Sequence, residues 1–179
     1  MSAEPYESFA LPHYADRDPA HNADHIRRIL RRLPDLSRGV EPEPQPRLLH
    51  FLACFHGLAE RIRRDDAFRA ETESFLIMNG WTPEQVAEGF LALGRHHVMP
   101  MTSEEKVVHD ANHLERLGAF GVAKAFTRGG ADGQSYERTL AIFERNLRMT
   151  RFLTPRGRAL ATEGLAYCRD FITRLRLEL

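Results

Sequence analysis

Apolar side chains recur every three to four residues through most of the chain, a spacing typical of amphipathic helices. The clearest stripe lies between residues 47 and 62, where Leu, Phe, Ala and Ile share one face. No segment alternates between apolar and polar residues as a half-buried strand would. The pattern predicts an all-α fold, with helices over Asn22–Leu33, Arg47–Ile62, Asp66–Met78, Thr82 to about His97, from Ser103 onwards, Ser135–Met149 and Thr154–Leu177.

Two of these helices begin with clear local signals. Thr82, Pro83 and Gln85 match an N-cap, a proline at the first helical position and a capping-box partner three residues after the cap. Thr154 and Pro155 repeat the first two of these signals. The starts of these two helices are therefore the best-defined boundaries in the sequence.

The length of 179 residues predicts one compact domain over residues 1–179, built as a helical bundle. We expect residues 1–18 to be an N-terminal extension and the proline-rich stretch 41–46 (EPEPQP) to be a stiff connector. Residues 128–133 (RGGADG) favour a glycine-rich turn over the alternative of a phosphate cradle.

Composition excludes several classes of function. Hydrophobic residues make up 42% of the chain and charged residues 28%, and 25 basic residues balance 25 acidic ones to a net charge of +0. This balance argues against a nucleic-acid polymer or an anionic membrane as partner, because such proteins usually carry a basic excess. The first ten residues do not resemble a signal peptide, and the two cysteines form no CxxC motif. We therefore expect a cytoplasmic protein with reduced thiols; a homo-oligomer is compatible with the sequence.

Three polar residues lie on or beside apolar helix faces: His25, His56 and Asp110. A buried carboxylate without a partner is strongly destabilising, so Asp110 needs one. A cation shared with two neutral imidazoles would satisfy all three groups. The alternatives are ordinary hydrogen-bonded core histidines, and for Asp110 a helix-packing hydrogen bond or an arginine salt bridge.

Histidines are clustered as well as numerous. Six of the nine fall in three close pairs, namely His21/His25, His96/His97 and His109/His113. Histidine is the commonest metal ligand and the side chain best suited to proton transfer near neutral pH, so clustering favours a site. The pair at the end of its predicted helix could instead interact with the helix dipole.

The order of these residues resembles that of the HD-domain superfamily, and most closely the small bacterial HD proteins of the nucleotide-phosphohydrolase type. The resemblance covers roughly residues 19 to 177. It is carried by residues 21–29 (HNADHIRRI), 55–58 (FHGL), 96–97 (HH), 106–112 (KVVHDAN), 114–126 (LERLGAFGVAKAF) and 154–161 (TPRGRALA).

This resemblance implies a divalent metal held by His25, His56 and Asp110, of which Mn²⁺, Mg²⁺, Zn²⁺ and Fe²⁺ are candidates. It also implies an aspartate directly after the second histidine, where this chain has Gly57. Acids common in the group are replaced by Asn22 and Asn112.

The implied activity is metal-dependent hydrolysis of a small phosphorylated compound, such as a nucleotide. His96 or His97 would donate a proton or hydrogen bond to the leaving phosphate, with His21 as an outer partner. Two alternatives remain open. The glycine could mark a degenerate HD domain that binds a ligand or a partner, or the two histidines and one carboxylate could hold iron in an oxygenase.

Overall fold

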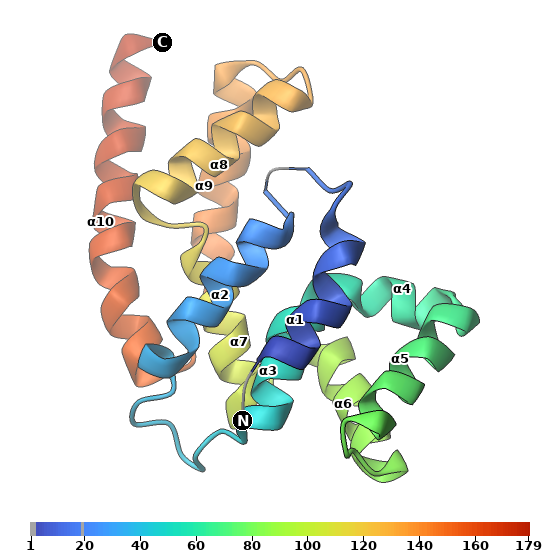
Figure 1. Cartoon of the computed structure of the whole chain (residues 1–179). Coiled ribbons are helices and arrows are strands. Elements are labelled where there is room, and N and C mark those ends of the chain that lie inside the picture. Colours follow the sequence, from blue (N-terminus) through green and yellow to red (C-terminus); the bar gives the residue numbers. More distant parts are fainter. Residues whose placement is uncertain (1–2, 19) are drawn as a thin grey trace.

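A computed structural model describes residues 3–18 and 20–179, and all regular structure within them is helical (Figure 1). This confirms the predicted all-α fold. The elements run in the order α1 (Glu4–Ala10), η1 (Leu11–Tyr14), α2 (Ala23–Leu36), α3 (Pro46–Phe55), η2 (His56–Leu58), α4 (Ala59–Arg64), α5 (Asp66–Met78), α6 (Pro83–Arg95), α7 (Ser103–Leu114), α8 (Gly118–Ala131), α9 (Tyr136–Met149) and α10 (Pro155–Glu178).

The predicted helix starts are confirmed. The hydroxyl of Thr82 accepts a hydrogen bond from the backbone N–H of Gln85, and the side chain of Gln85 accepts one from the backbone N–H of Thr82. At the start of α10, the Thr154 hydroxyl accepts from the backbone N–H of Gly157. Local capping chemistry therefore sets both boundaries.

The predicted helix over residues 47–62 is interrupted. It consists of α3 and α4, separated by the 3₁₀ turn η2. Gly57 lies in that turn, and glycine is a poor helix former. The turn also lets the His56 ring bond the backbone oxygen of Ala53 three residues earlier. The interruption therefore sets the position of a histidine that the sequence analysis had identified.

Residues 4–14, within the N-terminal extension expected over residues 1–18, are helical. They form α1 and η1, which pack on the bundle and bury Tyr6, Ala10 and Tyr14. The indole N–H of Trp81 donates to the Tyr6 hydroxyl at 2.9 Å. These contacts join segments far apart in the sequence, so local periodicity alone could not predict them.

The glycine-rich stretch after residue 127 is also more helical than expected. Helix α8, which was not among the predicted helices, continues through Ala131, and only Gly133 adopts a positive φ, of 66°. The Arg128 guanidinium pairs with Asp132 one turn later, at 2.9 Å. The turn is therefore confined to the end of the stretch.

The interior consists of two clusters of buried apolar side chains. The larger one is formed mainly by α1 to α7 and includes Phe51, Leu52 and Phe55. The smaller one lies between α8, α9 and α10 and contains Val122, Leu140, Phe143, Cys168 and Ile172. Both cysteines are buried free thiols.

Among the described residues, no helix has the length and apolar character needed to span a bilayer.

Candidate metal and anion site

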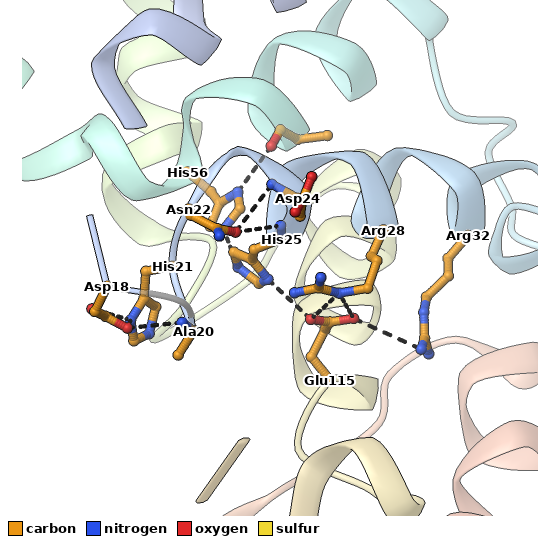
Figure 2. A network of polar contacts seen from close by, with 11 residues as sticks. Asp18, Ala20, His21, Asn22, Asp24, His25, Arg28, Arg32, His56 and Glu115 are labelled. Atoms are coloured by element: carbon orange, nitrogen blue, oxygen red, sulfur yellow. Dashed lines mark hydrogen bonds and ion pairs between the residues drawn. The ribbon is translucent and has the colours of Figure 1, made fainter. Parts of the chain in front are cut away.

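Two histidine rings meet where α2 approaches the 3₁₀ turn η2. His25 lies in the first turn of α2, whose N-cap Asn22 accepts hydrogen bonds from the backbone N–H groups of Asp24 and His25. His56 begins η2. The two Nε2 atoms are 3.0 Å apart, and both side chains are almost completely buried (Figure 2).

The outer nitrogen of each ring has a fixed hydrogen-bond role. His56 Nδ1 lies 2.9 Å from the backbone oxygen of Ala53, which can only accept. His25 Nδ1 lies 3.2 Å from Oε2 of Glu115. Burial alone would raise the pKa of Glu115, but the bonds from His25 and Arg28 outweigh it and lower that pKa, so the carboxylate also only accepts. Both Nδ1 atoms therefore carry the proton.

The two Nε2 lone pairs consequently point at each other. Burial lowers the pKa of His25 and, more strongly, that of His56, so both rings are neutral at pH 7. Two neutral acceptors at 3.0 Å repel unless a cation lies between or beside them. A shared proton fits between two nitrogens 3.0 Å apart. A divalent metal needs about 2.1 Å to each nitrogen, so it would bind to one side of the line that joins them.

Glu115, which bonds the outer nitrogen of His25, was not identified from the sequence. Its side chain is fully buried and accepts two bonds from Arg28 Nε, at 2.9 and 3.0 Å. Arg32 adds a more distant contact at 3.8 Å (Figure 2). The available signal was a charged residue between Leu114 and Leu117, the same kind of signal that identified Asp110.

Asp110 lies elsewhere. Its carboxylate is fully buried and accepts from the backbone N–H groups of Leu153 and Thr154 and from the Thr154 hydroxyl, at 2.8 to 3.0 Å. His109 Nδ1 approaches it at 3.1 Å. The predicted triad of His25, His56 and Asp110 is therefore not assembled. Asp110 instead satisfies its carboxylate at the start of α10, and among the described residues it forms no metal-holding group with the two histidines.

A cavity of about 520 Å³ opens beside the histidine pair. Among the described residues, none of those that line it is an Asp or a Glu. Its polar and charged lining residues are Tyr14, Arg17, His21, His25, His56, His97, Asn112, Arg116, Lys124, Arg128 and Asn146.

The positive charge of this lining is only partly compensated. Arg128 pairs with Asp18 and Asp132, which lie outside the cavity lining. Within residues 3–18 and 20–179, the side chains of Arg17, Arg116 and Lys124 have no hydrogen bond or ion pair. A cavity with three unpaired cations and no acid is suited to an anion.

The three histidines predicted to take part in catalysis have different positions. His21 lines the cavity and bonds the Asp18 carboxylate, at 3.0 Å. His97 also lines the cavity, whereas His96 does not. His96 is fully buried and its Nδ1 donates to the backbone oxygen of Leu93 at 2.7 Å. Of the two histidines proposed as the donor, His97 therefore lies at the cavity and His96 behind it; a catalytic role for either stays a prediction.

The positions where the family resemblance implies acids are neutral. Gly57 and Asn112 both line the cavity, and neither carries a charge. Across the described residues, no group of three or more His, Cys, Asp or Glu side chains is arranged to hold a metal ion. The described residues thus offer a cation two imidazole nitrogens, those of His25 and His56, and no carboxylate in the cavity lining.

Three solved structures are similar to this chain along nearly its whole length. Bacillus subtilis YpgQ in complex with ADP has a TM-score of 0.72 and 22% identity, covering 99% of this chain and 98% of that one. An HD-superfamily hydrolase from Bacillus thuringiensis has a TM-score of 0.73 and 23% identity, covering 98% and 95%. A predicted HD superfamily hydrolase from an uncultured Thermotogales bacterium has a TM-score of 0.61 and 21% identity, covering 98% and 91%.

No protein-family model and no curated protein sequence matches the chain. At these identities the structural similarity establishes the fold, and it agrees with the order of histidines noted in the sequence. The predicted resemblance is confirmed at this level: the chain has the fold of the HD-domain superfamily.

Proposed function

We propose that the chain is a metal-dependent phosphohydrolase that acts on a small phosphorylated compound in the cavity beside His25 and His56. The observation that carries the proposal is the convergence of the two Nε2 lone pairs at 3.0 Å, next to a cavity lined by cations and by no acid. The first feature favours a bound cation and the second an anionic ligand.

His25 and His56 would hold the metal through Nε2. Glu115 and the Ala53 carbonyl fix both rings in the tautomer that ligation requires. Nitrogen ligands favour Mn²⁺, Fe²⁺ or Zn²⁺ over an all-oxygen Mg²⁺ shell. When bound, such an ion polarises a phosphoryl oxygen and lowers the pKa of a coordinated water.

The remaining lining residues would bind and orient the substrate. Arg116 and Lys124 supply unpaired positive charge for phosphate oxygens. His97 lines the same cavity and could donate a hydrogen bond to the leaving group. The cavity volume of about 520 Å³ lies within the usual range for small-molecule sites, and the similar YpgQ was solved in complex with ADP, so a nucleotide is a suitable first substrate to test.

One observation favours a second function. The absence of acids from the cavity lining leaves the metal without an anionic ligand, which lowers its affinity. An HD fold that binds a phosphorylated ligand without hydrolysing it is therefore the alternative. Both functions use the same cavity, and they differ in whether the bound ligand is hydrolysed.

Metal analysis and a nucleotide panel separate these functions. We expect the purified chain to bind about one Mn²⁺ or Zn²⁺ with detectable affinity, and His56→Ala to weaken that affinity at least about 100-fold. His13→Ala is the matched control, because His13 does not line the cavity. Phosphate release with Mn²⁺ supports the hydrolase, and metal binding without release supports the binding module. Metal uptake unchanged in His56→Ala would refute the metal site.

A further inference from the structure

Gly57 lies at a close contact between the 3₁₀ turn η2 and the segment that precedes α2. A Cβ atom at this position would lie 2.9 Å from Cε1 and 3.0 Å from the hydroxyl oxygen of Tyr14. It would also lie 3.3 Å from Nη1 of Arg17. The first distance is shorter than real Cβ contacts and the other two are tight, so a larger residue at position 57 would force Tyr14 and Arg17 to shift from this packing beside His56.

Tyr14 is a fixed support in this arrangement. Its side chain is almost completely buried, and its hydroxyl donates to the backbone oxygen of Cys54 at 2.9 Å. Burial raises the pKa of Tyr14, so the hydroxyl remains a donor at physiological pH. The Arg17 guanidinium lies over the Tyr14 ring, 5.0 Å from its centroid. The aromatic ring therefore holds one face of the cation.

The N–H groups of the Arg17 guanidinium are available to a ligand. Among the described residues, its guanidinium has no hydrogen bond and no ion pair besides the contact with Tyr14. Arg17 lines the cavity, and its Nη1 would lie 3.3 Å from a Cβ atom at Gly57, the residue directly after His56. A planar group with several donors in a cavity without acids matches a phosphate or pyrophosphate group.

We propose that Arg17, supported by Tyr14 over Gly57, is a specificity-determining residue that binds the phosphate or pyrophosphate group of the ligand. The ligand class rests on the proposed function, but this binding needs neither metal nor hydrolysis. The glycine beside His56 has a positive role in this arrangement, because a side chain there would press on the Tyr14 ring and crowd the Arg17 guanidinium.

The test measures affinity for inorganic pyrophosphate by calorimetry in the presence of EDTA. We expect Arg17→Met to weaken binding at least about tenfold, the loss of one charge-assisted hydrogen bond. Arg69→Met is the matched control: Arg69 also lies over an aromatic ring, 5.1 Å from the centroid of Phe90, but does not line the cavity. Arg17→Lys should give an intermediate loss, because an ammonium keeps the charge without the planar fork.

Gly57→Ala tests the support independently. The added methyl group should displace Tyr14 and Arg17 and weaken pyrophosphate binding in the same direction as Arg17→Met. Manganese binding through His25 and His56, measured separately, should remain in Arg17→Met. Fluorescence of Trp81, the single tryptophan, verifies that each variant is folded.

The outcomes separate this inference from the proposed function. Arg17-dependent binding of pyrophosphate in EDTA supports the inference even if the chain hydrolyses nothing. Pyrophosphate affinity that is unchanged in Arg17→Met, or equally reduced in Arg69→Met, overturns it even if wild-type protein releases phosphate with Mn²⁺. Absence of pyrophosphate binding by the wild-type chain also overturns it.

Discussion

The Asp110 carboxylate connects the middle of the chain to its last helix. It is fully buried on α7 and accepts hydrogen bonds from the backbone of Leu153 and Thr154 and from the Thr154 hydroxyl. Such a carboxylate orients the segment that enters α10 and satisfies backbone donors that the helix start leaves unpaired. These hydrogen bonds account for the burial of Asp110 without a metal.

Asp110→Asn should destabilise the fold without weakening the site. The amide replaces one accepting oxygen by a donor that faces other donors, so we expect the free energy of unfolding to fall by about 2–4 kcal/mol. Urea unfolding followed by Trp81 fluorescence measures this loss. Metal and pyrophosphate affinities of the folded variant should match wild type; a selective loss of metal binding would return Asp110 to the ligand set.

Periodicity predicted which residues are buried, but it did not predict which side chains contact one another. The stripes of α2, α3 and α7 correctly indicated that His25, His56 and Asp110 are buried. Periodicity says which face of a helix is inside, and it does not say which distant side chain lies opposite. The partners of Asp110 are 43 and 44 residues away, and Glu115 meets His25 across 90 residues. The histidine pair could be found from the sequence, and its surroundings could not.

At the scale of elements, the start of α10 depends on a glycine. A Cβ at Gly157 would clash with a carboxylate oxygen of Asp110 and lie 2.8 Å from the Thr154 hydroxyl oxygen. The absence of a side chain therefore allows α7 and α10 to approach closely at this point.

Gly157→Ala should consequently be destabilising even though alanine is the better helix former. We expect a loss of about 1–3 kcal/mol, typical of overpacking in a close contact. Gly94→Ala in α6 is the matched control, because a Cβ there meets no atom within 4 Å. Gly94→Ala should be neutral or slightly stabilising. Thermal unfolding of both variants and of the wild-type chain measures the difference. Equal stability of the two variants would mean that the α7–α10 contact relaxes freely.

Elements with local signals were predicted best. The boundaries of α6 and α10 follow from Thr82 and Thr154, whose hydroxyls bond groups within three residues. The interruption of the predicted helix at η2 and the packing of α1 depend on tertiary contacts, such as the bond between Trp81 and Tyr6. Local chemistry therefore fixes where helices start, and tertiary packing decides where they break.

For the whole molecule, buried neutral histidines make stability depend on pH. Burial, followed by the nearby Arg116, lowers the pKa of His113 to about 4, and burial also lowers the pKa values of His25, His56 and His96. Between the ordinary histidine pKa of about 6.5 and these lower values, the unfolded chain binds more protons than the folded one. The free energy of unfolding is therefore highest above pH 6.5 and decreases as the pH falls toward the lowered pKa values.

His113→Asn should make this loss smaller. The difference between the pKa of about 4 for folded His113 and the ordinary value of about 6.5 corresponds to about 3 kcal/mol in the free energy of unfolding. About 2 kcal/mol of this is lost between pH 7 and pH 5. Asparagine can still donate to the Arg151 carbonyl, which His113 Nδ1 contacts at 3.2 Å. Urea unfolding at pH 7 and pH 5 in EDTA compares the two chains. An identical decrease in both would assign the acid sensitivity to other groups.

The division of the interior into two clusters has a consequence for cooperativity. Leu147 of α9 packs against both clusters, and together with Phe143 it lines the cavity opposite residues of the larger cluster such as Tyr14. We therefore expect α8, α9 and the adjoining part of α10 to open as one unit, in the absence of a ligand, while the larger cluster stays folded. A molecule in the cavity contacts both units at once, so any opening must first release it. A ligand bound in the cavity would therefore make the two units unfold together, in one cooperative transition.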